Sequence, residues 1–127
     1  MGRAKQNNGG RRADLDGLYV RSKWEANVAR WLKWMEAQGE IQGWAYEPEI
    51  FRFEGVKRNP ISYTPDFKVI DADGSIFYYE VKGWMDSMSK SKLKRMAKFY
   101  PDVKILVIDE AFMKGLRAFA GLIEGWE

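Results

Sequence analysis

The chain has 127 residues, of which 46% are hydrophobic and 15% aromatic, a composition that supports one folded core of ordinary size. It contains neither Cys nor His, which excludes disulfide scaffolds, thiolate or histidine-ligated metal sites, and hydrolases with a histidine base. Any hydrolytic chemistry must therefore use carboxylates, Lys or Tyr together with a hard cation that prefers oxygen ligands.

The net charge of +3 is unevenly distributed along the chain. Residues 1–33 carry 8 basic and 3 acidic side chains, and residues 86–104 carry 6 basic and 2 acidic ones. Residues 34–85, between them, carry 5 basic and 9 acidic side chains. This distribution fits a protein whose basic surfaces contact a polyanion while a cation neutralises a carboxylate cluster between them. No apolar run is long enough for a membrane span or a signal peptide, so we expect a cytoplasmic protein.

Residues 1–17 are rich in Gly, Asn and Arg and lack apolar periodicity. They predict a flexible basic arm, followed by a single domain over residues 18–127. Apolar residues at helical spacing from Trp24 to Met35 predict a first helix, with Gly39 as its stop signal.

Three strand-like segments follow the first helix. Ile41–Phe53 has the composition of a strand, but Pro48 interrupts its hydrogen bonding, so we expect an edge or bulged strand. Tyr63–Ile70 and Ser75–Lys82 flank residues 71–74, whose sequence Asp-Ala-Asp-Gly is typical of a turn. The two segments therefore predict an antiparallel hairpin.

The remaining segments predict a helix, a strand and a second helix. The first of these helices is capped by Ser87 or Ser89 and ends before Pro101. Val103–Ile108 is apolar and predicts a strand buried on both faces, and Ala111–Ile123 predicts a terminal helix. The resulting order of helix, three strands, helix, strand and helix predicts an α/β fold with a mixed sheet.

The residues that suggest chemistry lie at the open end of the predicted hairpin, away from its turn. Asp66 stands at the start of its first strand, and Glu80 and Lys82 stand at the end of its second. Side chains two residues apart on a strand point to the same face, so Glu80 and Lys82 share one face, directed away from the core. Strand pairing would bring Asp66 close to Glu80. Two neighbouring carboxylates repel each other, and a divalent cation relieves that repulsion.

A cation held by Asp66, Glu80 and the backbone carbonyl of Val81 would bind a phosphate oxygen and lower the pKa of a water molecule. Lys82 would then orient the attacking water or help to deprotonate it. The alternative is that Glu80 and Lys82 form an ordinary solvent-facing pair on an amphipathic strand, because E-x-K is common by chance.

Four motifs resemble those of a known superfamily. They are RSKWEANVARWL (Arg21–Leu32), WAYEPE (Trp44–Glu49), YTPDF (Tyr63–Phe67) and YYEVKG (Tyr78–Gly83). With the order of predicted elements, they resemble the αβββαβ core of the PD-(D/E)XK nucleases over about residues 18 to 108. They look most like small phage-borne proteins related to the phage endonuclease I type of Holliday junction resolvase.

This resemblance implies a restriction-endonuclease-like αβββαβ core with an additional C-terminal helix. It implies hydrolysis of DNA phosphodiester bonds with Mg²⁺, for which Mn²⁺ would substitute. It further implies a homodimer that cuts branched DNA during recombination, in the host cell if a phage encodes the protein. Alternatives are a nicking or double-strand endonuclease of the same fold, a catalytically inactive DNA-binding or assembly module, and an RNA-binding domain.

The same resemblance gives Glu25 two competing interpretations. Resolvases of this superfamily often place a metal-linked glutamate on the first helix, which makes Glu25 a catalytic and metal-binding candidate. However, Ser22 and Glu25 also have the spacing of a capping box. We prefer the catalytic interpretation and expect the two roles to be hard to combine.

Several basic side chains are predicted to contact DNA. They are Arg11 and Arg12 in the arm, Arg21 and Lys23 near the first helix, and Lys90, Lys94, Arg95 and Lys98 on one face of the second helix. The alternative for the second helix is a solubilising surface. Trp84, just after the predicted site, either stacks on a base or covers the core.

Overall fold

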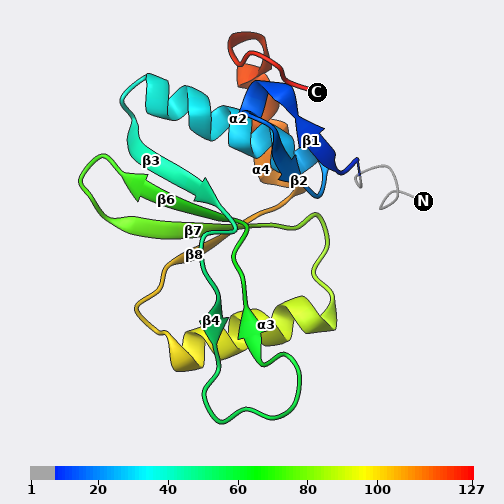
Figure 1. Ribbon diagram of the computed structural model, residues 1–127, viewed down its shortest axis with the longest axis vertical. Coiled ribbons are helices and arrows are strands. Elements are labelled where there is room, and N and C mark those ends of the chain that lie inside the picture. Colours follow the sequence, from blue (N-terminus) through cyan, green and yellow to red (C-terminus); the bar gives the residue numbers. More distant parts are fainter. Residues whose placement is uncertain (1–7) are drawn as a thin grey trace.

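The computed structural model describes residues 8–127 and contains a four-stranded mixed sheet in the order β3-β6-β7-β8 (Figure 1). β3 (Ile41–Tyr46) is antiparallel to β6 (Phe67–Asp71), and β6 is antiparallel to β7 (Ile76–Val81). β8 (Ile105–Ile108) is parallel to β7. The mixed α/β fold and the β6–β7 hairpin predicted from the sequence are therefore confirmed.

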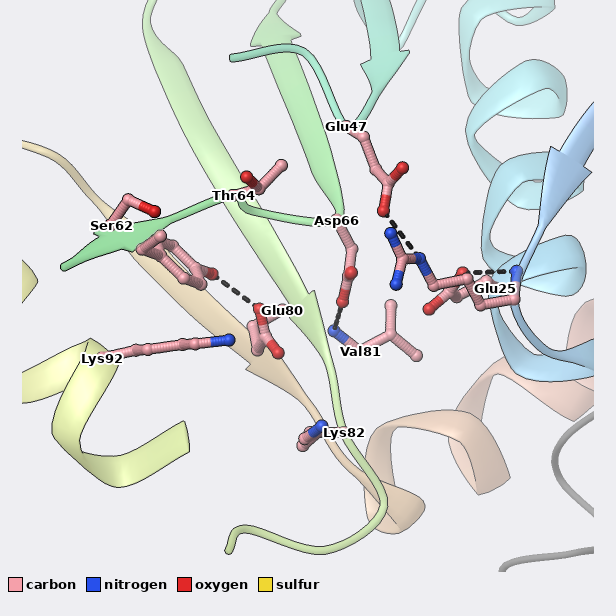
Figure 2. Close-up of a pocket in the computed structure, with 11 residues that line it drawn as sticks. Glu25, Glu47, Ser62, Thr64, Asp66, Glu80, Val81, Lys82 and Lys92 are labelled. Atoms are coloured by element: carbon pink, nitrogen blue, oxygen red, sulfur yellow. Dashed lines mark hydrogen bonds and ion pairs between the residues drawn. The ribbon is translucent and has the colours of Figure 1, made fainter. Parts of the chain in front are cut away.

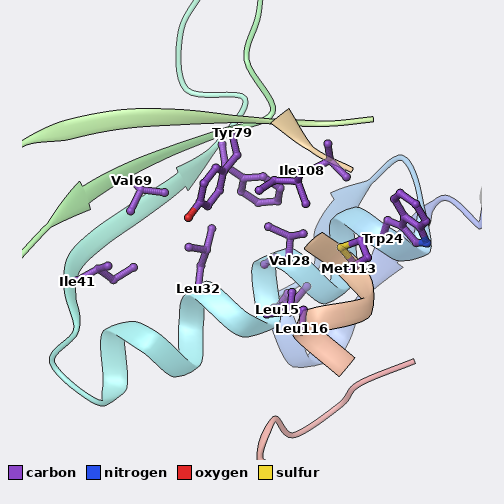
Figure 3. Packing of buried hydrophobic residues seen from close by; sticks show 13 residues of the cluster. Leu15, Trp24, Val28, Leu32, Ile41, Val69, Tyr79, Ile108, Met113 and Leu116 are labelled. Atoms are coloured by element: carbon purple, nitrogen blue, oxygen red, sulfur yellow. The ribbon is translucent and has the colours of Figure 1, made fainter. Parts of the chain in front are cut away.

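One face of the sheet is covered by α2 (Lys23–Ala37) and α4 (Glu110–Leu116) (Figure 1). The hydroxyl oxygen of Ser22 accepts a hydrogen bond from the backbone N–H of Glu25 at 3.1 Å, which caps α2 as in the capping-box alternative. The apolar stripe of α2 then packs against the sheet, with α4 alongside (Figure 3). The buried residues of this first cluster include Trp24, Val28, Leu32, Phe67, Val69, Tyr79, Val81, Ile108, Met113 and Leu116.

The other face is covered by α3 (Ser87–Phe99) and a short hairpin of β4 (Phe51–Arg52) and β5 (Ser62–Tyr63) (Figure 1). Phe51, Phe53, Tyr63, Tyr78 and Met96 form a second buried cluster there. Because Tyr78 belongs to this cluster, the face of β7 that carries Tyr78 is covered. This is also the face of Glu80 and Lys82, by the alternation of strand side chains. The structure therefore does not support the alternative in which Glu80 and Lys82 form an ordinary solvent-facing pair.

The N-terminal segment differs from the prediction of a flexible arm. Residues 1–7 lie outside the described part of the chain, but β1 (Gly10–Arg12) pairs with β2 (Leu18–Val20) in an antiparallel hairpin. The 3₁₀ turn η1 (Ala13–Leu15) connects the two strands, and the side chain of Leu15 is buried in the first cluster. The prediction is therefore wrong for residues 8–17, and the folded domain starts before residue 18.

Ion pairs hold this segment against α2. The guanidinium of Arg30 donates two hydrogen bonds to the carboxylate of Asp14, at 2.7 and 3.0 Å, and a third to Glu127 at 2.9 Å. Arg30 is itself buried, and Arg12 also pairs with Glu127. Asn27 accepts from Arg30 and from the backbone N–H of Glu127. These contacts tie η1, α2 and the last described residue together.

Four further expectations are revised. β3 is an edge strand with a register shift between Ile41 and Gly43, as predicted, but the segment Ile41–Phe53 divides around Pro48 into β3 and the separate strand β4. The buried strand expected at Val103–Ile108 is the edge strand β8, with Leu106 54% exposed, because it pairs with β7 alone. The terminal helix predicted at Ala111–Ile123 divides into α4 and the 3₁₀ segment η2 (Arg117–Leu122). The N-terminus of α3 is capped by Asp86 rather than by Ser87 or Ser89. No helix in residues 8–127 combines the length and apolar character that a membrane span requires.

Replacement of Arg30 by Ala should lower the free energy of unfolding by about 2–4 kcal/mol, because it leaves Asp14 and Glu127 without their buried partner. Urea unfolding at neutral pH measures this change. The matched control is Lys114→Ala, which removes a solvent-exposed ion pair with Glu110 and should change stability by less than about 0.5 kcal/mol. Equal effects of the two substitutions would show that the Arg30 network does not anchor the N-terminal segment.

Candidate active site

A pocket of about 320 Å³ lies beside the end of β7, where α2, β5 and α3 approach the sheet (Figure 2). It contains all of the residues predicted to form the catalytic and metal site. These are Glu25, Asp66, Glu80, Val81 and Lys82. They come from α2, the start of β6 and the end of β7, so the structure brings together residues that are up to 57 positions apart in the sequence.

Asp66 is held in place by both its backbone and its side chain. Its backbone N–H donates to the carbonyl of Tyr79 at 3.1 Å, and its carbonyl accepts from the N–H of Glu47 at 2.8 Å. Its carboxylate oxygen Oδ2 accepts from the backbone N–H of Val81 at 2.7 Å (Figure 2). The predicted approach of Asp66 to the Glu80–Lys82 segment is confirmed by this contact.

Glu80 is oriented by a buried tyrosine. The hydroxyl of Tyr63, on β5, donates to Oε1 of Glu80 at 2.7 Å (Figure 2). The Tyr63 side chain belongs to the second cluster and is almost fully buried. Sequence reasoning did not assign a role to Tyr63, because a tyrosine at the start of a strand gives no indication of which partner its hydroxyl will find. The only local signal was its position within the YTPDF motif.

The carboxylates of the pocket are held where negative charge is unfavourable. Burial, followed by the negative charges of Glu80 and Glu25, raises the pKa of Asp66 to about 8, against the opposing effect of the Val81 N–H. Burial likewise raises the pKa of Glu80, although the hydrogen bond from Tyr63 and the charges of Lys82 and Lys92 oppose this. A positive charge bound between these carboxylates would be strongly stabilised.

Glu25 bonds to the backbone before α2 and also lines the pocket, two placements that we expected to be hard to combine. Its Oε1 accepts from the backbone N–H of Arg21 at 3.0 Å, just before the start of α2, and from the hydroxyl of Tyr46 at 2.6 Å. Its side chain nevertheless lines the pocket together with Asp66 and Glu80. The two placements are compatible, because one carboxylate oxygen accepts both of these hydrogen bonds while the side chain lines the pocket. A catalytic or metal-binding role of Glu25 stays a prediction.

The donors of the pocket fit a hard divalent cation. Asp66, Glu80 and Glu25 supply carboxylate oxygens, and oxygen ligands are those that Mg²⁺ prefers. Burial and the neighbouring carboxylates raise the pKa of Asp66, so a nearby positive charge would favour its ionised form. Within residues 8–127, no three acidic side chains are already grouped closely enough to form a complete metal cluster. A cation would therefore have to draw these side chains together or share them with substrate and water oxygens.

The lysine of α3 that reaches the pocket is Lys92, which sequence reasoning missed (Figure 2). Its positive charge lowers the pKa of Glu80. Successive α-helical residues are about 100° apart, so Lys92 lies on nearly the opposite side of α3 from Lys94. The helical pattern shows that these lysines face different ways, but not which side packs toward the site.

The basic residues predicted to contact DNA occupy varied environments. On α3, Lys90, Lys94 and Lys98 are exposed, whereas Arg95 donates to the backbone carbonyls of Arg58 and Pro60 and so anchors the β4–β5 loop. None of these four lines the pocket in the described structure.

Near the N-terminus, Arg12 is paired with Glu127, and Arg11 is exposed and donates to the carbonyl of Gly17 at 3.0 Å. Arg21 is exposed and pairs with Glu47 at 2.9 Å, and Lys23 is half-buried in the first turn of α2. Arg11, Arg12, Arg21 and Arg95 therefore have partners within the protein, while Lys90, Lys94 and Lys98 are exposed.

A family model described as "Protein of unknown function (DUF1064)" matches residues 5–114. The chain belongs to the DUF1064 family. The match includes α2, the whole sheet and every residue of the pocket, so the pocket lies within the family domain. Comparison of this DUF1064 protein with curated proteins gives no match.

The pH dependence of stability tests the environment of Asp66 in the DUF1064 protein. A carboxyl whose pKa is raised on folding stabilises the fold at pH values below its unfolded pKa, and this contribution is lost as pH rises toward the folded pKa. In EDTA, stability should therefore fall between about pH 4 and pH 8, by at most about 1.4 kcal/mol per pH unit for this one group. Asp66→Asn keeps an acceptor for the Val81 N–H without the charge, so it should be more stable than the wild type at pH 8.

Urea unfolding in EDTA at pH 5 and pH 8 makes the measurement. The control is Asp102→Asn, which removes an exposed carboxylate that does not line the pocket. An Asp66→Asn protein that is less stable than the wild type at pH 8 would contradict the view that ionised Asp66 destabilises the fold.

Proposed function

We propose that this protein is a metal-dependent DNA endonuclease of the PD-(D/E)XK type, which hydrolyses phosphodiester bonds in the pocket beside β7. The observation that carries the proposal is the convergence of Asp66, Glu80 and Lys82 in one pocket, with Glu25 completing the set of carboxylates. The elements that position them follow the chain order helix, strand, strand, strand, helix and strand, with β4 and β5 inserted after β3. Together with the sequence motifs, this arrangement supports the nuclease assignment.

Asp66, Glu80 and Glu25, with the carbonyl of Val81, would hold Mg²⁺, and Mn²⁺ would substitute for it. When bound, the cation neutralises these carboxylates and stabilises the negative charge that develops on the phosphate. Tyr63 keeps Oε1 of Glu80 fixed, which leaves the carboxylate in one orientation. The raised pKa of Tyr63, caused by burial and by the charge of Glu80, keeps its hydroxyl a neutral donor.

The two lysines of the pocket have distinct tasks in this proposal. Lys82 shares the strand face of Glu80 and orients the attacking water. Lys92 approaches from α3 and binds a phosphate oxygen, because an ammonium group near the reacting phosphate offsets charge in the transition state (Figure 2). The exposed Lys90, Lys94 and Lys98 give α3 a further basic stripe along which a nucleic-acid backbone would bind.

Branched DNA, such as a four-way junction, is the proposed substrate, and its symmetry implies a homodimer. These two features are supported by the resemblance to junction resolvases. A role in phage recombination, in the cytoplasm of the host, belongs to the same proposal.

Cleavage of a labelled four-way junction and of a matched linear duplex, each with Mg²⁺ and with EDTA, tests the proposed activity. Glu80→Gln and Lys82→Ala should each reduce cleavage by at least about 100-fold, because each removes a group that acts in the transition state. Glu80→Gln keeps an acceptor for Tyr63, so its thermal unfolding should stay close to that of the wild type.

Glu110→Gln, which alters an exposed carboxylate on α4, is the matched control and should cut normally. Cleavage of the junction alone would support a resolvase, and equal cleavage of both substrates would support a general endonuclease. Metal-independent cleavage, or full activity in Glu80→Gln, would refute the proposed site. Binding without any cleavage would support an inactive DNA-binding module.

Lys92→Ala tests the residue that only the structure reveals. Its loss should reduce cleavage by about 10- to 100-fold, the range expected when one charge-assisted contact to the reacting phosphate is removed. Single-turnover rates at saturating DNA measure the effect on chemistry apart from binding. Lys114→Ala removes an exposed lysine from α4 and is the control. An unchanged rate in Lys92→Ala would reassign this lysine to a purely structural role.

A further inference from the structure

A second pocket, of about 520 Å³, adjoins the proposed active site. It is lined by Gly9, Tyr19, Arg21, Tyr46 and Glu47. Arg21 and Glu47 also line the pocket that contains Asp66, so the two cavities share a wall. We propose that this second pocket binds an unpaired nucleobase, stacked on Tyr19, beside the bond to be cut. The identity of the ligand as DNA rests on the proposed function.

Tyr19 is displayed on a fixed support. It lies in the middle of β2, where its neighbours Leu18 and Val20 face the core and leave its own side chain 56% exposed. A single exposed aromatic side chain is ordinary on a protein surface. This one is distinguished because it lines a cavity next to a candidate catalytic site, on a hairpin that the buried Leu15 holds against the domain. A rigid exposed ring is what base stacking requires.

The other walls of the cavity are also held in place. The Tyr46 hydroxyl donates to Glu25, and its ring meets Phe67 edge-on with centroids 5.2 Å apart. Arg21 bonds to Glu47 at 2.9 Å, yet its side chain remains 69% exposed. The backbone at Glu47 turns sharply, with φ of 44° in the left-handed region, directly after β3. The cavity is therefore preorganised rather than formed by loose side chains.

The chemistry of the walls favours a base over a phosphate. The carboxylate of Glu47 would repel a phosphate but accepts hydrogen bonds from the amino groups of bases. The planar guanidinium of Arg21 can stack on a base or donate to its edge. Arg11 lies opposite Tyr19 in the β1–β2 register and is exposed, so it places a positive charge where the adjoining sugar-phosphate backbone would run.

A base can reach this cavity only after leaving the duplex stack. The volume of about 520 Å³ lies within the range of small-molecule pockets and so has room for a base, whereas a paired base remains between its neighbours in the helix. The site therefore selects DNA that presents an unpaired nucleotide, as at a fork, a branch point or a single-stranded segment. Stacking on Tyr19 would tolerate any base, because every base has an aromatic face.

Binding to a single-stranded oligonucleotide that contains 2-aminopurine, measured in EDTA, tests the proposal without cleavage. Tyr19→Ala should weaken binding by about 5- to 100-fold, as expected for the loss of one base–aromatic stack, and should abolish the fluorescence quenching that stacking produces. Tyr19→Phe and Tyr19→Trp should retain both signals, because the ring and not the hydroxyl is required. A duplex of the same sequence should lose much less affinity in Tyr19→Ala.

Phe119→Ala removes another exposed aromatic ring, on η2, and is the control for a general loss of apolar surface. Thermal unfolding of each variant verifies the fold. Unchanged single-strand binding in Tyr19→Ala, or an equal loss for single strand and duplex, overturns the nucleobase site even if metal-dependent cleavage is observed. Tyr19-dependent binding without any cleavage by the wild type would instead support the nucleobase site while refuting the nuclease.

Discussion

The hydrogen bond between the Asp66 carboxylate and the backbone N–H of Val81 fixes the arrangement on which the candidate site depends. The β6–β7 ladder reaches only to the pair Phe67 and Tyr79, so Asp66 lies just beyond it. There its side chain, rather than its backbone carbonyl, takes the Val81 N–H. This hydrogen bond holds the Asp66 carboxylate beside Val81, the residue that follows Glu80 on β7. The site is therefore formed where the pairing of β6 with β7 ends.

Two tyrosine–glutamate pairs stabilise the acids around that point. Tyr63 donates to Glu80, and Tyr46 donates to Glu25. Burial is the largest cause of the raised pKa of each tyrosine, and both remain neutral donors at physiological pH. Each hydroxyl satisfies one oxygen of a carboxylate without neutralising its charge. These hydrogen bonds orient the acids without adding positive charge, and the raised pKa of Asp66 indicates that a bound cation would favour its ionised form.

Short-range patterns in the sequence predicted the parts of the site that depend on one element or on one hairpin. The strand alternation around Glu80 and Lys82, the turn before β7 and the Ser22 cap follow from local spacing alone. The proximity of Asp66 followed from the pairing of two strands joined by a recognisable turn. These features required no information about the packing of distant segments.

The parts that sequence reasoning missed depend on long-range contacts. Residues 8–17 are held against the domain by the buried Leu15 and by the ion pairs that Arg30 makes with Asp14 and Glu127. Apolar periodicity in the sequence does not predict such contacts. In the sequence, Lys92 cannot be distinguished from the other lysines of α3. Only the packing of α3 against the second cluster determines that Lys92 faces the pocket. In the same way, β8 has the composition of a central strand, and only the sheet order shows that it is an edge.

Arg21, directly after the N-terminal hairpin, would connect the proposed nucleobase site to the acids of the first pocket. The backbone N–H of this residue donates to Glu25, while its side chain pairs with Glu47 in the wall between the two pockets. A ligand that occupies the second pocket and displaces the Arg21 side chain from Glu47 would act on a residue whose backbone already positions a site carboxylate. Because α2 begins directly after Arg21 and Ser22, movement there is limited by the cap of the helix. Recognition of an unpaired base and orientation of Glu25 are therefore expected to depend on the same short segment.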